Sequence, residues 1–324
     1  MGAERGFCAL PFTMTQASAP GKIILFGEHA VVYGRPALAV PLPSIRVNVE
    51  VDALPPQGKN GILLRSPDLN LSFLLNEVDR ENPLALAIHL AFEALQVTYP
   101  PNMRFTIQSD IPISSGLGSG AAVSVAIVRA ICRHFSCSLS DERVSQIAYE
   151  VERLHHGTPS GIDNTVISYE MPVYFKRGED VKRFSIHKPV SLVLGHSGES
   201  TPTAEVVSAV REAWQKNKPH YEDIFDAIGR IVDLAYGALR RGDIELLGPL
   251  MDQNQMQLEA LAVSNPALED LIRAAKEAGA SGAKLSGGGR GGFMIALVEP
   301  NKLVAVQQAL ADAGATHVLQ TRIA

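Results

Sequence analysis

The chain has few of the features that mark secreted, membrane-spanning or nucleic-acid-binding proteins. Its 324 residues include only three cysteines (Cys8, Cys132 and Cys137), too few for a disulfide framework and without metal-site spacing. No apolar run reaches the roughly 18 residues that a membrane span needs. Lysine and arginine (29) are outnumbered by aspartate and glutamate (34), so no basic excess exists to bind nucleic acid. These absences predict a cytoplasmic protein with neither a membrane nor a nucleic acid as partner.

What is present is typical of a soluble globular enzyme of the α+β class. Hydrophobic residues make up 46% of the chain and charged residues 19%, and the length favours two domains. A rise in charge between residues 176 and 190 places the boundary near residue 185, giving domains 15–185 and 186–324. Residues 1–14 lack a signal-peptide core and are interpreted as a disordered extension.

One stretch, residues 111–122, organises the rest of the chain. An alternating strand-like run at 104–110 enters it, and a helical pattern of apolar residues from Val123 to Ile131 leaves it. Between them, glycines and serines stand where a helix begins, and the free amides of a helix N-terminus suit an anion such as phosphate. No Gly-Lys-Ser/Thr follows, so this is not a Walker A loop. Taken alone, such a helix entry is equally well a simple turn.

The patterns before and after this loop predict alternating strands and helices. Strands are expected at 22–26, 37–42, 45–51, 162–166, 191–194, 293–298 and 317–319. Helices are expected at 83–96, 141–156, 203–216, 221–240, 243–262, 266–279 and 301–313. A second glycine loop occupies residues 284–292.

Several polar residues could carry chemistry, and each also has a plain structural explanation. Lys22 could be a surface lysine at a strand start, and Glu28-His29 a solvated turn. Glu152 could lie on an exposed helix face and pair with a nearby arginine, and Asp163 could cap a turn. The decision between these interpretations depends on the combination of motifs.

Four motifs, taken in order, resemble the GHMP small-molecule kinases. They are Ala-Pro-Gly-Lys followed by Gly-Glu-His-Ala-Val-Val (19–32), Gly-Leu-Gly-Ser-Gly-Ala-Ala (116–122), His-Gly-Thr-Pro-Ser-Gly-Ile-Asp-Asn (156–164) and Lys-Leu-Ser-Gly-Gly-Gly-Arg-Gly-Gly (284–292). The likeness covers nearly the whole chain from about residue 16, in order and spacing. Within the superfamily, residues 27–34 and 156–164 are most similar to the mevalonate kinase family.

The resemblance implies a two-domain fold, with an N-terminal half like domain 2 of ribosomal protein S5 and a ferredoxin-like C-terminal half. ATP and the acceptor would bind between them. Asp163 would be the catalytic carboxylate with Lys22 beside it, Glu152 would bind Mg²⁺, and Glu28, His29 and Thr201 would contact the substrate. The residues expected to bind the ATP phosphates are Pro112, Ser114, Ser115, Gly116, Leu117, Gly118, Ser119, Gly120, Ala121 and Ala122.

Two positions depart from the family pattern. The serine that commonly reaches magnesium is replaced by Gly120, so either Ser119 takes its place as a ligand or a water does. In the second loop Gly288 stands for an alanine and Arg290 for a glycine. The Arg290 guanidinium could reach a phosphate or point to solvent.

The activity implied by the resemblance is ATP-dependent phosphorylation of the primary hydroxyl of mevalonate, an early step of isoprenoid biosynthesis. Alternatives are a sister kinase acting on phosphomevalonate or on the tertiary hydroxyl of mevalonate, and a non-catalytic sensor that binds ATP and a metabolite. The presence of Lys22, Glu152 and Asp163 together disfavours the sensor. The sequence leaves a homodimer open.

Overall fold

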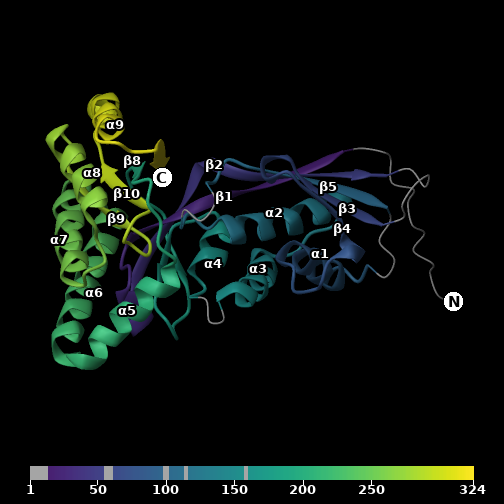
Figure 1. Ribbon diagram of the computed structural model, residues 1–324, viewed down its shortest axis with the longest axis horizontal. Helices are drawn as coiled ribbons and strands as arrows, with labels where there is room; N and C mark the ends of the chain where they lie inside the picture. The colour runs from purple at the N-terminus through teal and green to yellow at the C-terminus, as the bar shows by residue number, and fades with distance from the viewer. Residues whose placement is uncertain (1–13, 55–60, 98–101, 113–115, 157–159) are drawn as a thin grey trace.

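The computed structural model describes residues 14–54, 61–97, 102–112, 116–156 and 160–324. The predicted extension therefore lies outside the described residues except for Met14, and so do Ser114 and Ser115 of the first glycine loop. The two halves of the chain follow one another along the long axis of the molecule, with the second half at the left in Figure 1.

The first half is built on a mixed seven-stranded sheet. Its strands are β1 (Thr15–Phe26), β2 (Ala37–Ala53), β3 (Ile62–Ser66), β4 (Leu71–Leu74), β5 (Met103–Ser109), β6 (Val173–Phe175) and β7 (Lys182–Arg183). They follow the order β4-β3-β5-β2-β6-β7, and β1 pairs with β2. β3 and β5 are parallel, and the other pairs are antiparallel.

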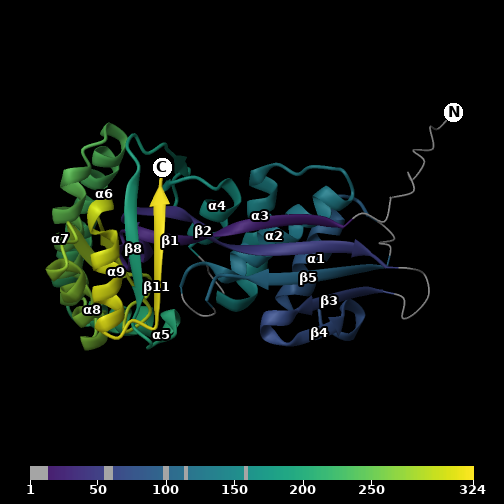
Figure 2. The same ribbon diagram turned by 90° about the horizontal axis from the view of Figure 1, so that it is seen from above.

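Four helices cover one face of this sheet (Figure 1). Seen from above in Figure 2, the strands run lengthwise in front of these helices. They are α1 (Pro83–Ala94), α2 (Ser119–His134), α3 (Asp141–His156) and α4 (Ile162–Tyr169). Short 3₁₀ turns form η1 (Ala30–Tyr33), η2 (Pro67–Leu69) and η3 (Leu75–Glu77). α2 is buried on most sides because it packs against β1, β2 and three other helices, which explains its run of small and branched apolar residues.

The second half is a four-stranded antiparallel sheet with helices. Its strands are β8 (Val190–His196), β9 (Gly282–Ser286), β10 (Phe293–Leu297) and β11 (His317–Ile323), in the order β11-β8-β10-β9. Its helices are α5 (Thr203–Lys216), α6 (Lys218–Arg241), η4 (Ile244–Leu246), α7 (Leu247–Ala260), α8 (Pro266–Glu277), η5 (Pro300–Lys302) and α9 (Leu303–Asp312). Along the chain, a strand, helices, two strands, a helix and a strand follow one another, and with the sheet order β11-β8-β10-β9 they make the ferredoxin-like arrangement.

Two predicted elements are wrong in instructive ways. The strands expected at 37–42 and 45–51 are one strand, β2, because a bulge accommodates the break: Gly21 of β1 pairs with Leu42 and Pro20 with Arg46. The strand expected at 162–166 is the start of α4. Gly161 (φ 85°) precedes this helix, and its carbonyl oxygen accepts a hydrogen bond from Thr165 Oγ1 at 2.6 Å. The β-branched Thr165 and Val166 therefore lie in a helix.

The two halves contact each other through several elements. β11 packs against β2, β9 against β1, and α6 against β1 and β2. The first sheet ends with β7 at Arg183 and the second begins with β8 at Val190. Across the described ranges, no helix combines the length and apolar character that crossing a membrane requires.

Candidate active site

An ion pair between Lys22 and Asp163 lies at the centre of the site. Lys22 Nζ is 2.9 Å from Asp163 Oδ1, and the lysine is 4% exposed whereas the Asp163 side chain is 28% exposed. Lys22 is on β1 and Asp163 is in the first turn of α4, so two distant segments meet here. The pair is therefore formed from a buried cation and a carboxylate that a ligand can still reach.

The first glycine loop runs directly beside this pair. The backbone N–H of Lys22 donates to Leu117 O at 2.9 Å. Gly118 has φ 77°, and a Cβ there would lie 3.0 Å from Lys22 Cγ and 2.8 Å from Ile167 Cδ1. α2 starts at the next residue, Ser119. The amides at the start of this sixteen-residue helix therefore lie next to the Lys22–Asp163 pair, where they suit a phosphate.

The other residues predicted for the phosphate loop fall into two groups. The first group is at least partly accessible and consists of Pro112, Gly116, Ser119 and Gly120. The second group is buried in the core beneath the loop and consists of Leu117, Ala121 and Ala122. A Cβ on Gly120 would meet nothing within 4 Å. Among the described residues, no neighbouring side chain therefore occupies the space that a serine side chain at position 120 would take.

Glu152 of α3 carries a strongly perturbed carboxyl. Its pKa is raised to about 8, chiefly by burial and also by the negative charge of Asp163, while Lys22 acts to lower it. Glu152, Asp163 and Lys22 are thus electrostatically coupled. Two carboxylates beside a phosphate-binding helix terminus fit Mg²⁺, which uses one or two carboxylates and completes its shell with phosphates and waters. No group of three or more histidine, cysteine or acidic side chains forms a complete metal cage within the described ranges.

A buried amide ties the two helices that carry these carboxylates. Asn164, next to Asp163, donates from Nδ2 to Ser145 Oγ at 2.8 Å and to Ser145 O at 3.2 Å. Ser145 is on α3, seven residues before Glu152. The bond therefore fixes α4 on α3 and with it the separation of Asp163 and Glu152.

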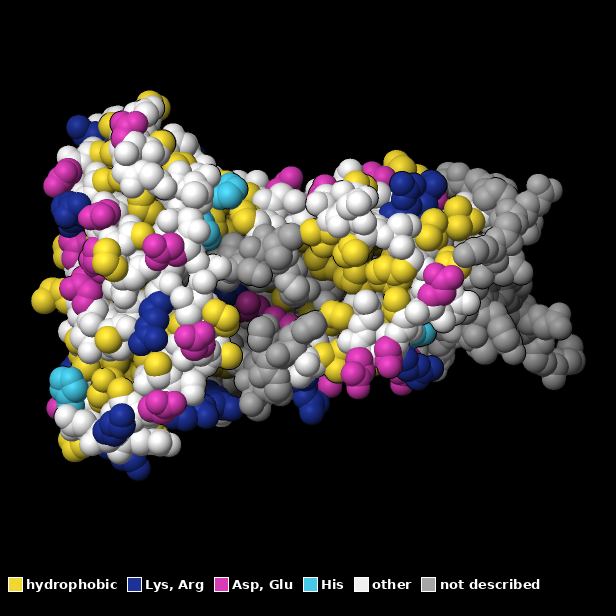
Figure 3. Space-filling view, viewed as in Figure 1, with side chains coloured by type: hydrophobic (Ala, Val, Ile, Leu, Met, Phe, Trp, Pro, Cys, Tyr) yellow, Lys and Arg dark blue, Asp and Glu magenta, His cyan; other side chains and the backbone are white. Residues whose placement is uncertain are grey.

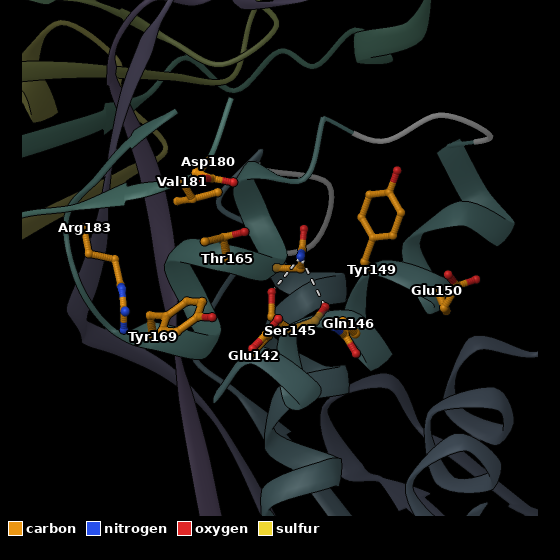
Figure 4. Close-up of a pocket in the computed structure, with 11 residues that line it drawn as sticks. Glu142, Ser145, Gln146, Tyr149, Glu150, Thr165, Tyr169, Asp180, Val181 and Arg183 are labelled. Atoms are coloured by element: carbon orange, nitrogen blue, oxygen red, sulfur yellow. Dashed lines mark hydrogen bonds between the residues drawn. The ribbon is translucent and has the colours of Figure 1, made fainter. Parts of the chain in front are cut away.

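A separate cavity of about 460 Å³ lies on the outer side of α3 and α4. Figure 4 shows Tyr149 and Glu150 at one end and Tyr169 and Arg183 at the other. None of the predicted catalytic, phosphate-binding or metal residues lines it. The space-filling view in Figure 3 shows a recess near the middle of the molecule in which acidic and basic side chains are visible.

Glu28 and His29 are buried where the two halves meet. Glu28 Oε1 pairs with Lys284 Nζ of β9, and both side chains are 0% exposed. His29 Nε2 donates to Gly288 O at 2.9 Å, and burial lowers the pKa of His29 to about 4. These residues are therefore not a solvated turn. Their predicted contact with the substrate stays a prediction.

Thr201 and Arg290 are also joined across loops of the second half. Thr201 Oγ1 donates to Arg290 O at 2.8 Å, and Arg290 Nε donates to Ala262 O at 3.3 Å. Arg290 adopts φ 53°, the left-handed region that glycine would occupy without strain. A phosphate contact and a solvent-facing position both stay predictions for its guanidinium.

The sequence analysis gave no role to Lys284 and Ser286. Lys284 pairs with Glu28, and Ser286 Oγ donates to Ile24 O of β1 at 2.8 Å. A signal was present, because Lys284 is a charged residue in a short strand otherwise made of small and apolar residues, and such a charge is buried only when paired.

A glycine-rich loop at a helix start, a lysine–aspartate pair and a ferredoxin-like second half are together typical of a small-molecule kinase. Models of the N-terminal and C-terminal domains of GHMP kinases match residues 83–170 and 235–316. The chain belongs to the GHMP kinase family.

Within that family, several mevalonate kinases match nearly the whole chain. Those of Thermococcus sibiricus and Pyrococcus furiosus are 36% and 35% identical, over 94% of this chain and of each relative. The crystal structure of L. major mevalonate kinase in complex with R-mevalonate superposes with a TM-score of 0.84 and 29% identity, over 96% of both chains. The resemblance inferred from the motifs and the two-domain α+β fold are thus confirmed.

Proposed function

We propose that this kinase transfers the γ-phosphoryl group of ATP to the primary hydroxyl of mevalonate, giving 5-phosphomevalonate. The observation that carries the proposal is the Lys22–Asp163 pair beside the glycine loop, in a chain whose full-length relatives are mevalonate kinases. The pathway context implied is isoprenoid biosynthesis. The cytoplasmic location and the homodimer stay predictions.

Asp163 is proposed to accept the hydroxyl proton or to hold the hydroxyl in line with the γ-phosphate. Phosphoryl transfer depends chiefly on positioning and charge neutralisation, and a carboxylate near the acceptor serves both. The ammonium of Lys22, at 2.9 Å, keeps Asp163 in its place and offers positive charge to the transferring group. The loop amides from Gly116 to Ala122 bind the remaining phosphate oxygens.

Glu152 is proposed to hold Mg²⁺ together with Ser119 or a water beside Gly120. A bound Mg²⁺ neutralises the phosphate charge that develops during transfer. The coupling of Glu152 to Asp163 supports this role, because two nearby carboxyls with one lysine between them favour a further cation.

Glu28, His29 and Thr201 are proposed to face the substrate hydroxyls. All three contact the second glycine loop. Glu28 pairs with Lys284, and His29 donates to Gly288 O. Thr201 donates to Arg290 O. Lys284, Gly288 and Arg290 belong to the second glycine loop, so that loop is a common support for the acceptor side.

The test is an ADP-release assay with mevalonate, phosphomevalonate, galactose and homoserine as acceptors. We expect turnover with mevalonate, and phosphorus NMR should place the new phosphate on the primary oxygen. Turnover confined to another acceptor, or a phosphate on the tertiary oxygen, would identify a sister kinase. Tight binding of ATP and mevalonate without any transfer would identify a sensor.

A further inference from the structure

Lys284 and Ser286 bind the strand that carries the catalytic lysine. Both are on β9, two residues apart, so their side chains point to the same face of the strand. Lys284 Nζ pairs with Glu28, just beyond the end of β1, and donates to Leu285 O at 2.5 Å. Ser286 Oγ donates to Ile24 O, two residues from Lys22. The C-terminal half therefore holds β1 on both sides of its end.

The charges at this contact form a row of alternating sign that leads to the reacting groups. Lys284 pairs with Glu28, Glu28 interacts electrostatically with Lys22, and Lys22 pairs with Asp163. Glu28 Oε2 is buried and has no hydrogen-bond partner in the described part of the chain. The second oxygen of Glu28 is thus not engaged elsewhere, and its charge acts on the ammonium of Lys22.

We propose that Lys284 and Ser286 are positioning residues for phosphoryl transfer, Lys284 by binding Glu28 and Ser286 by binding the backbone of Ile24. This inference rests on the proposed function of the site. The Lys284 charge holds the Glu28 carboxylate on the side of β9, and Lys22 stays directed at Asp163. When Lys284 is removed, Lys22 is the other cation that acts on ionised Glu28, so Glu28 competes with Asp163 for its charge.

That competition has a recognisable pH signature. Burial raises the pKa of Glu28, whereas Lys284 from β9 and Lys22 from β1, the charged groups that act on it, lower it. Without Lys284 the carboxyl is protonated over more of the pH range and ionises as the pH rises. The activity of a Lys284→Met variant should therefore gain an ionisation step, with kcat falling toward high pH.

The experiment compares wild type, Lys284→Met and the double variant Lys284→Met/Glu28→Gln. All rates are divided by the folded fraction and measured with the acceptor that the wild type turns over fastest. We expect kcat of Lys284→Met to fall by about tenfold or more, since small misplacement of a reacting group is costly, with KM for ATP nearly unchanged. The additional pH step should disappear in the double variant, and Lys284→Arg should recover part of the rate.

A matched control is Lys276→Met, which removes a lysine paired with Asp252 on the surface of the same half. We expect it to behave as wild type. For Lys284→Met, a wild-type kcat overturns the proposal and leaves Lys284 a residue of stability alone. A lowered kcat with the wild-type pH profile also overturns it, because the loss would then not come from the charge of Glu28.

If Lys284→Met does not fold, Ser286→Ala decides, because it deletes only one hydroxyl. A fall in kcat of about threefold or more at an unchanged melting temperature supports positioning. An unchanged kcat overturns it. If the wild type turns over only an acceptor other than mevalonate, the proposed function fails while these comparisons still judge Lys284 and Ser286.

Discussion

The contact between Gly118 and Lys22 can be tested by a single methyl group. In Gly118→Ala, the new Cβ lies 3.0 Å from Lys22 Cγ and 2.8 Å from Ile167 Cδ1, so at least one side chain must move. Residue 118 also has φ 77°, where a Cβ costs about 1–2 kcal/mol. Adding about 1–2 kcal/mol for the overlap gives a total destabilisation of roughly 2–4 kcal/mol.

The effect on catalysis should exceed the effect on stability. The methyl presses on the stem of Lys22, whose ammonium pairs with Asp163, and a displacement of about 1 Å at a reacting group can cost roughly a hundredfold in rate. We expect kcat per folded protein to fall by about 10–100-fold, measured by ADP release. The melting temperature should fall by roughly 5–15 °C.

Gly120→Ala is the matched control, because it adds the same methyl two residues further on. A Cβ there meets nothing within 4 Å. Alanine also favours the helix by up to about 1 kcal/mol. We expect near-normal kcat and equal or higher stability. If Gly118→Ala kept more than about half of the wild-type rate at a normal melting temperature, the close approach of Gly118 would not position Lys22.

Further predictions concern the carboxylates and the buried histidine. Asp163→Asn should lower kcat by roughly 10²–10⁴-fold with little change in ATP affinity, and retention of more than about a tenth of the rate would contradict its role. Glu152→Gln should weaken apparent Mg²⁺ affinity, measured by titration, and excess Mg²⁺ should recover part of the rate. In the wild type, that affinity should rise with pH up to about 8, because a proton competes for Glu152. His29 has a pKa of about 4, below its ordinary value, so the unfolded chain takes up the proton first as the pH falls. The stability present above about pH 6.5 should therefore be lost between pH 6.5 and 4, by up to about 3 kcal/mol in urea unfolding, and His29→Gln should lack this component.

The sequence allowed the family, the α+β class and most long elements to be predicted, because these depend on local patterns. The amphipathic periods of α5, α6 and α8 and the proline and asparagine at the start of α1 are local signals. The start of α4 is predicted as a strand because Ile162, Thr165 and Val166 favour strands on their own. Their burial against the rest of the first half, which the sequence does not display, outweighs that preference.

The sequence motifs predict which residues belong to the site, but not the contacts that these residues make in the fold. The motifs named Lys22, Asp163 and Glu152, but not the contact between Lys22 and Gly118, which depends on how β1 lies beside the loop. Lys284 and Ser286 were missed because their partners, Glu28 and Ile24, come from the other half of the chain. Contacts of that range leave no periodic pattern in a single sequence.

The pairing of Glu28 with Lys284 also has a consequence for synthesis. The two residues are 256 positions apart, which at ribosomal rates of about 5–20 residues per second means roughly 13–50 seconds between their appearance. During that interval the nascent chain already contains the first glycine loop, Lys22, Glu152 and Asp163, yet Glu28 has no cation from β9. A ribosome that stops before residue 284 releases a product with every proposed catalytic group and an incomplete core, which quality-control proteases can recognise.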